Sequence, residues 1–258
     1  MRALFLGLLL ALVPFPSALA GSFYGAGGGG ATASEARQYG IAIDWTSVTT
    51  IEIQPGQRIA DDGTTITVPT AFSVTFADID TGAEANAGYY VWLTGPASAV
   101  LSLSATAPTG VTDGKYLAGW IYNDSGSDIF AFRTEPNGDS LDVWWDATPG
   151  THSVVSVAGT QPTSTQTVNT ATGGHAPPAS VFGLHLNGES YNEGTIKLTW
   201  GSVAAHQISA NTGLSIASFQ VYLPTQSSSF GWAMTGAGGA GDQTSIYVAG
   251  FRFDRSGV

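Results

Sequence analysis

The side chains that could do chemistry in this sequence are four histidines and a few closely spaced acidic residues. The histidines are His152, His175, His185 and His206. None of them has the HxH or HExxH spacing that is typical of a zinc site. His185 lies between Leu184 and Leu186, so on a strand it would face away from both leucines. We interpret the histidines as ordinary surface or satisfied side chains, with a ligand role for His185 as the alternative.

Two short loops carry oxygen ligands at alternating positions, as calcium sites do. They are Asp78–Gly82 and Asn123–Asp128. Calcium takes about six to eight oxygen ligands, and neither loop continues with the glutamate that closes an EF-hand. Asp and Asn also bond their own backbone in β-turns, which explains the same pattern. We interpret both loops as turns and expect no metal ion and no cofactor.

Signatures of catalysis are missing from the sequence. Glycoside hydrolysis needs two carboxylates across a cleft, and the sequence does not place its candidates opposite each other. Those candidates are Asp78, Asp80, Asp142 and Asp146. The chain has no GxSxG motif, no phosphate-binding GxxxxGK[ST] loop and no cysteine. We therefore expect a protein that is not an enzyme.

Aromatic side chains are the remaining candidates for a binding surface. Trp144 and Trp145 are adjacent, so on a strand they face opposite sides. One is expected in the core, and the other exposed or covered by a neighbouring subunit. An exposed Trp can stack on a sugar or anchor a subunit interface, and we favour an interface or core role. Trp92 and Trp120 complete the candidate surface and interface aromatics.

Short strands bounded by Gly, Pro, Asn or Asp are the elements that must position these residues. The clearest are Phe72–Asp78, Tyr89–Thr94, Val100–Ala105, Tyr116–Asn123, Ile129–Thr134, Leu141–Trp145, Ser153–Val157, Val181–Leu186, Thr195–Trp200, Ser218–Leu223, Phe230–Thr235 and Ser245–Arg252. Asn137-Gly138 predicts a hairpin. In the last strand, Tyr247, Ala249, Phe251 and Phe253 are expected on one face. The pattern predicts an all-β fold, an antiparallel β-sandwich or jelly-roll-like arrangement.

Residues 1–20 have the outline of a secretory signal, with Arg2, an apolar run and an Ala18-Leu19-Ala20 ending. Two interpretations stay open: cleavage after Ala20, or a short apolar helix retained as an anchor. The candidate anchor residues are Leu4, Phe5, Leu8, Leu9 and Leu12. Residues 21–38 form a Gly-rich linker. Residues 39–258 form one β-domain with an edge strand at Thr165–Thr170, or two domains if 158–178 is a linker.

The charge balance excludes one class of partner. Lys and Arg number 8 against 19 Asp and Glu, which gives a net charge of −11. Nucleic-acid binding depends on clustered cations, so we expect no nucleic acid among the partners. Charged residues make up 10% of the chain, against about 25% in an average soluble protein. The electrostatic barrier to self-packing is therefore low, and a homo-oligomer is expected.

Three segments resemble a module of tail-fibre and other surface proteins of tailed bacteriophages. They are Tyr89–Leu93, the LSLSATAPT stretch Leu101–Thr109, and Lys115–Ile121. The ending Ser245–Arg252 is similar to the closing strand of such modules. The resemblance implies a β-sandwich on a virion, often trimeric, and its motifs are structural rather than catalytic. One departure is the signal-like start, which such proteins usually lack.

Together these observations predict a non-enzymatic virion structural protein of a tailed phage. It would serve as a tail or baseplate fibre, spike or receptor-binding element, with other virion proteins and a host surface glycan or protein as partners. The alternative is a secreted bacterial β-sandwich that binds carbohydrate or extracellular matrix. A third interpretation is a secreted glycan-active enzyme with acidic residues in a groove.

Overall fold

A computed structural model describes fourteen segments between residues 40 and 255. They are 40–59, 63–80, 82–108, 116–124, 126–138, 140–146, 152–158, 160–178, 181–191, 195–200, 203–209, 217–224, 227–235 and 243–255. The chain divides into two units, Met1–Glu35 and Ala36–Val258, and every described residue belongs to the second. The expected signal or anchor, with Leu4, Phe5, Leu8, Leu9 and Leu12, and the Gly-rich linker lie outside the described residues.

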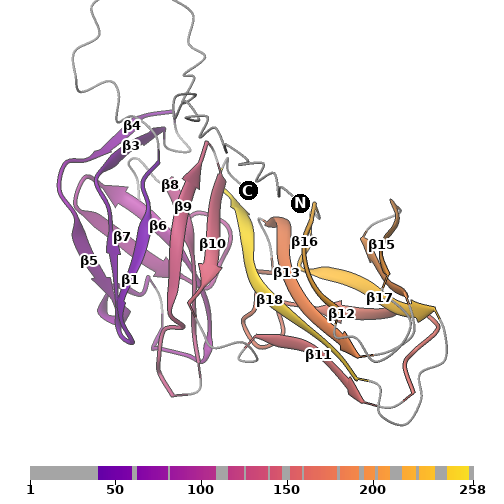
Figure 1. Cartoon of the computed structure of the whole chain (residues 1–258). Helices are drawn as coiled ribbons and strands as arrows, with labels where there is room; N and C mark the ends of the chain where they lie inside the picture. The colour runs from indigo at the N-terminus through magenta and orange to yellow at the C-terminus, as the bar shows by residue number, and fades with distance from the viewer. Residues whose placement is uncertain are drawn as a thin grey trace, which may run out of the picture. The chain divides into compact units, whose positions relative to one another are not determined.

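Antiparallel strands account for most of the described residues (Figure 1). The first half contains β1 (Ile43–Ser47), β2 (Thr50–Ile53), β3 (Gly56–Ile59), β4 (Thr65–Val68), β5 (Phe72–Thr75), β6 (Ala87–Gly95), β7 (Ser98–Ser102), β8 (Tyr116–Asn123) and β9 (Phe132–Asn137). The second half contains β10 (Ser140–Trp145), β11 (Ser153–Ala158), β12 (Gln166–Asn169), β13 (Val181–Tyr191), β14 (Thr195–Trp200), β15 (Val203–Ser209), β16 (Ala217–Leu223), β17 (Ser229–Thr235) and β18 (Gln243–Asp254).

The described strands assemble into five sheets, in which many neighbouring strands are far apart along the chain. The small sheets have the orders β1-β2-β5, β3-β4 and β7-β6-β8, and a four-stranded sheet has the order β12-β17-β14-β15. The largest sheet has the order β16-β13-β18-β10-β9, with β11 also paired to β18. β18 is its centre: it pairs with β13 on one side and with β10 and β11 on the other (Figure 1).

The structure confirms the all-β prediction and each of the strands predicted as clearest, within a few residues at their ends. A strand also forms in the predicted Thr-rich edge segment, where β12 is the outer strand of its sheet. The predicted Asn137-Gly138 hairpin forms between β9 and β10, with Asn137 paired to Ser140. β1 to β4 and β15 were not among the clearest predicted strands.

The strand predicted for Phe72–Asp78 ends early, because its second half forms a short 3-10 helix, η2 (Phe76–Asp78). Thr75 caps this turn: its side chain accepts from the Ala77 amide, and its own amide donates to the Asp78 carboxylate at 2.8 Å. This reciprocal capping satisfies backbone amides that the ladder would otherwise use. No helix in the described part of the chain is long and apolar enough to cross a membrane.

One part of the buried core joins the largest sheet to the β7-β6-β8 sheet, and the same cluster continues into the other sheets. Residues Tyr116–Ile121 of β8 are all buried. The Trp120 ring meets the rings of Phe251 on β18 and Trp145 on β10, with centroids 5.8 and 6.3 Å apart. This aromatic cluster holds the inner face of β10 and β18 in place. The outer face of the same strands is therefore free to carry polar side chains.

The expectation of one apolar face along the whole of β18 was wrong. Phe251 and Phe253 are buried. Earlier in the strand, however, the buried residues are Ile246 and Val248 instead of Tyr247 and Ala249. The register against β13 shifts here, since His185 pairs with Gly250 and Leu186 with Val248. The extra residue is a β-bulge, which reverses the alternation of faces. Ala249 consequently lies at the outer surface of the sheet.

Candidate functional site

The outer face of the largest sheet carries one continuous row of side chains that crosses all five of its main strands. Arg133 on β9 pairs with Trp144 on β10, and Trp144 pairs with Gly250 on β18. Gly250 pairs with His185 on β13, which pairs with Tyr222 on β16. We call Trp144, His185 and Tyr222 the aromatic row. The bulge of β18 lies at its middle.

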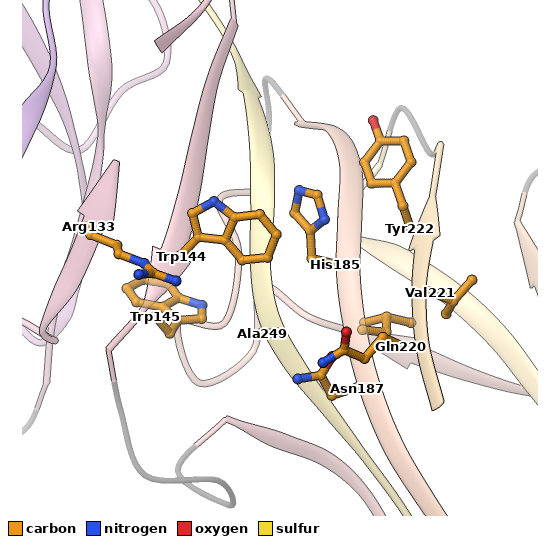
Figure 2. A pocket seen from close by; sticks show the side chains of 10 residues that line it. Arg133, Trp144, Trp145, His185, Asn187, Gln220, Val221, Tyr222 and Ala249 are labelled. Atoms are coloured by element: carbon orange, nitrogen blue, oxygen red, sulfur yellow. The ribbon is translucent and has the colours of Figure 1, made fainter. Parts of the chain in front are cut away.

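Gly250 of β18 lies between Trp144 and His185 in the strand register and packs closely against the backbone of β10. A Cβ at this position would lie 2.2 Å from the carbonyl oxygen of Val143, so only glycine fits. Neighbouring strands lie about 4.8 Å apart, which places residues two strands away about 10 Å apart. The rings of Trp144 and His185 nevertheless have centroids 4.1 Å apart with 32° between their planes. The two side chains reach toward each other across β18 (Figure 2).

Gly183 of β13 leaves room for the ring of Tyr222 on the neighbouring strand β16. A Cβ at Gly183 would lie 2.3 Å from the phenol oxygen of Tyr222, so the ring occupies the place of the missing side chain. The centroids of His185 and Tyr222 lie 5.0 Å apart. The guanidinium carbon of Arg252 lies 5.2 Å from the centre of the Tyr222 ring. Tyr222 is therefore held on two sides while 37% of it stays exposed.

Asp142 and Arg252 form a paired charge beside the row. The Arg252 Nε and Nη2 atoms donate to the two carboxylate oxygens of Asp142 at 2.7 and 3.0 Å. The Asn137 amide adds a third bond at 3.0 Å. Burial acts to raise the pKa of Asp142, but the hydrogen bonds from Arg252 and Asn137 outweigh it, and the pKa is lowered below its ordinary value. The carboxylate thus stays ionised and is neutralised locally.

His185 is the neutral centre of the aromatic row. Its Nε2 atom lies 3.6 Å from an Asp142 oxygen, too far for a good hydrogen bond. Burial lowers the pKa of His185 below its ordinary value, although Asp142 acts in the opposite direction. At neutral pH the imidazole is therefore an uncharged ring between two other rings.

A cavity of about 410 Å³ opens beside the aromatic row. It adds two amides, Asn187 on β13 and Gln220 on β16, which are directly paired across the strands. The remaining lining comes from Arg133, Trp145, Leu186, Val221 and Ala249. Ligand pockets typically measure about 300 to 1,000 Å³ and combine flat apolar walls with a few polar groups. This cavity falls within that range of volume, and aromatic, aliphatic and polar side chains share its lining (Figure 2).

The predicted aromatic candidates are now placed. Trp144 and Trp145 lie on opposite faces of β10, as predicted: Trp144 joins the aromatic row, and Trp145 packs against Phe251 in the core while one edge borders the cavity. Trp92 and Trp120 are only 3% and 2% exposed, so both are core residues and neither is available to a ligand. His185 faces away from the buried Leu184 and Leu186, as expected.

The sequence did not single out Arg133, Asn187, Gln220 or Tyr222. The signal that could have found them is alternation: His185 and Asn187 alternate with Leu184 and Leu186 on β13. Gln220 and Tyr222 alternate in the same way with the buried Phe219 and Leu223 on β16, with Val221 half-buried between them. What alternation does not give is that the two strands are neighbours.

His152 and His175 form a cluster with Trp145 on the inner side of β10. The imidazole of His152 stacks on Trp145 with centroids 4.6 Å apart, and the Trp145 indole donates to the His175 carbonyl at 2.9 Å. The Nδ1 atoms of His152 and His175 lie 3.0 Å apart. Burial lowers the pKa of His152 from 6.5 to about 4, and His175 adds to this shift. The His206 side chain lies outside the described residues.

In both acidic loops an aspartate side chain accepts hydrogen bonds from nearby backbone amides. An Asp124 oxygen accepts from the amides of Gly126 and Asp128 at 2.7 and 3.1 Å, as in the β-turns that the sequence suggested. Asp78 caps η2. A search for groups of three or more potential metal ligands among the described residues found none.

Comparison with known proteins does not place the chain in a family. A scan against protein-family models gave no match, and a search of curated proteins gave none either. Function is therefore inferred from the site, since a fold alone does not specify one.

Proposed function

We propose that this chain is a non-enzymatic glycan-binding protein and that the aromatic row with its cavity is the sugar site. The observation that carries the proposal is the arrangement of Trp144, His185 and Tyr222 beside two paired amides in an open cavity (Figure 2). A pyranose has apolar C–H faces and a rim of hydroxyls. Flat rings suit the faces, and amides suit the rim.

The division of work within the site follows from the side chains. Trp144 offers the largest apolar surface, and His185 supports it from behind at 4.1 Å. Asn187 and Gln220 can each donate and accept hydrogen bonds, which matches hydroxyl groups that do both. Because these residues project from paired strands, their relative positions are fixed before a ligand arrives. Such preorganisation reduces the entropic cost of binding.

Binding suits this lining better than hydrolysis does. Among the described residues that border the cavity there is no Asp or Glu. Among the candidate acids, Asp142 lies 3.6 Å from His185 of the aromatic row, and both of its oxygens are engaged by Arg252. Glycoside hydrolysis needs a free acid and a free base or nucleophile on either side of the scissile bond. The third interpretation, a glycan-active enzyme, therefore has no support from the site.

The proposed setting comes from the sequence. The resemblance to tailed-phage surface modules favours a virion fibre, spike or receptor-binding element, in which glycan binding would attach the particle to its host. The alternative is a secreted bacterial protein that binds carbohydrate after cleavage at Ala20. Intact-mass measurement of the native protein separates them: a chain starting at Met1 supports the retained anchor, and one starting at Gly21 supports secretion.

We also propose that the sheets pack as a β-sandwich. The contacts of Trp120 on β8 with Phe251 and Trp145 on the facing sheet support this arrangement. Two sheets that share an aromatic core in this way bury their inner faces and leave their outer faces to solvent. An experimental structure in which β8 does not face β10 and β18 would refute it.

The experiment is a glycan-array screen of the full chain, followed by calorimetric titration of the best ligand. Trp144→Ala should weaken binding at least about tenfold, a difference of about 1.4 kcal/mol, because the main stacking surface is lost. Leu103→Ala is the control, since Leu103 is 53% exposed and does not line the cavity. Circular dichroism must show that both variants fold. Equal binding by Trp144→Ala and wild type would rule out this site.

A further inference from the structure

We propose that the site selects acidic glycans and that Arg133 binds the sugar carboxylate. This inference rests on the proposed glycan-binding function and adds the class of sugar. Its starting point is position: Arg133 lines the cavity and is the register partner of Trp144. A ring stacked on Trp144 therefore has a cation beside it.

Arg133 is one of few cations, and the others nearby are occupied. Five of the chain's 8 Lys and Arg residues lie among the described residues: Arg58, Arg133, Lys197, Arg252 and Arg255. Arg58 donates to the Gly138 carbonyl, Arg252 binds Asp142, and Arg255 donates to the Ile41 and Ser140 carbonyls. Within the described part of the chain the Arg133 side chain makes no hydrogen bond or ion pair, and the residue is exposed.

The carboxylates around Arg133 leave its guanidinium free. Glu135 is two residues further along the same face of β9, and Asp146 follows Trp144 by two residues on β10. Residues two apart on a strand are separated by about 7 Å. Within the segments that the structure describes, neither carboxylate forms an ion pair with Arg133. Asp142 is neutralised by Arg252, and Arg133 is the one Lys or Arg among the described residues that line the cavity.

The chemistry of the guanidinium specifies the group it would hold. Its planar fork matches a carboxylate with two parallel hydrogen bonds, a geometry that neutral hydroxyls do not reproduce. The site then has a polarity. The carboxylate lies toward β9, the ring lies on Trp144, and hydroxyls on the far side meet Asn187 and Gln220. Acidic sugars such as uronates and sialic acids have this combination of a ring, a carboxylate and hydroxyls.

The test compares each acid with its own neutral ester. Oligosaccharides such as trigalacturonate and sialyllactose are titrated into the full chain as free acids and as methyl esters, at one ionic strength. The ester keeps every ring and hydroxyl and removes the charge. We expect at least one acid to bind tenfold or more tightly than its ester. Arg133→Gln should reduce that acid to the affinity of its ester and leave the ester unaffected.

Lys197→Gln is the matched control, because Lys197 lies on β14 outside the cavity and its loss changes the net charge equally. It should leave the preference for the acid intact. If acids and esters bind equally, or if Arg133→Gln keeps the preference, the selectivity inference is wrong while Trp144-dependent binding of the ester still supports a glycan site. If no member of either series binds, the preference for acidic glycans is overturned, and the glycan-array screen decides separately on the glycan-binding function.

Discussion

The Nδ1 atoms of His152 and His175 lie 3.0 Å apart, and the two rings meet edge to face. At this distance one nitrogen must donate a proton and the other must accept it. The bond therefore needs at least one neutral imidazole as the acceptor, since two imidazolium ions would each present a donor. The pair joins β11 to the segment before β13, so its protonation state bears on how that part of the chain is held.

Stability is therefore expected to fall on mild acidification. The folded-state pKa of His152 is about 4, below its ordinary 6.5, so the unfolded chain takes up protons first as the pH drops. The contribution of the neutral pair is fully present above pH 6.5 and is lost progressively between pH 6.5 and about 4. Burial also lowers the pKa of His175 and of His185, which adds to the same trend.

Urea unfolding of wild type at several pH values from 7.5 to 4 measures this effect. His152→Phe keeps a ring on Trp145 and removes the titrating group, so its stability should depend less on pH in this window. A wild-type midpoint that does not move between pH 7 and 4.5 would contradict the expectation. The lowered pKa of Asp142 acts only at more acidic pH, below the ordinary range of a carboxyl.

Two glycine substitutions in the site should lower the free energy of unfolding by different amounts. A Cβ at Gly250 meets the backbone oxygen of Val143 at 2.2 Å, so Gly250→Ala must separate β10 from β18 and should cost about 2 kcal/mol or more of unfolding free energy. A Cβ at Gly183 meets only the outer end of the Tyr222 ring, at 2.3 Å, and this ring can swing into solvent. Gly183→Ala should cost less than about 1 kcal/mol.

Chemical denaturation and glycan titration together check this pair. Gly183→Ala should weaken binding while its denaturation midpoint stays near wild type, because Tyr222 leaves its place in the aromatic row. Gly250→Ala should lower the midpoint clearly. The reverse order of stabilities would show that the backbone approach at Gly250 is not as close as described.

Loss of the Asp142 charge should destabilise the sheet that carries the site. Asp142→Asn leaves the Arg252 guanidinium with a weaker acceptor and disturbs the bond from Asn137, at an expected cost of about 1 to 3 kcal/mol. A double-mutant cycle with Arg252→Gln isolates the pair from its surroundings. A coupling energy near zero would mean that solvent already screens the pair, since the Arg252 side chain is 31% exposed.

Self-association of the full chain is the expected consequence of its weakly charged surface. We expect the native protein to sediment as a homo-oligomer at micromolar concentration, with a trimer as the favoured state. Sedimentation equilibrium gives the mass directly. A strictly monomeric chain over this range would refute the expectation and weaken the case for a fibre or spike.

Local pattern predicted much of the fold, because side-chain alternation and turn residues are properties of neighbouring positions. The opposite faces of Trp144 and Trp145 and the hairpin after Asn137 both followed from it. β3 escaped because Gly56-Gln57-Arg58-Ile59 has a single large apolar residue. The faces of Tyr247 and Ala249 were mispredicted because a bulge shifts the alternation, and no residue type announces it.

The candidate site could not be assembled from sequence for a different reason. Its parts come from β9, β10, β13, β16 and β18, and their juxtaposition depends on the order of strands in the sheet. Alternation marks His185, Asn187 and Tyr222 as outward-facing but does not state that β16 lies beside β13. The same limit hid the contact between His152 and His175, which are 23 residues apart.

The central position of β18 in the largest sheet affects the order in which the protein folds. β18 follows all the other described strands along the chain, yet it lies between β10 and β13 in the sheet. Its Gly250 is the register partner of both Trp144 and His185. During synthesis β9 and β10 on one side, and β13 and β16 on the other, leave the ribosome before β18, the strand that joins them. Such long-range pairing is slow to form. A chain shortened before β18 would keep Arg133, Trp144, His185 and Tyr222 but would lack the strand that places them side by side. Binding at the proposed glycan site would therefore show that β18 has been inserted into the sheet.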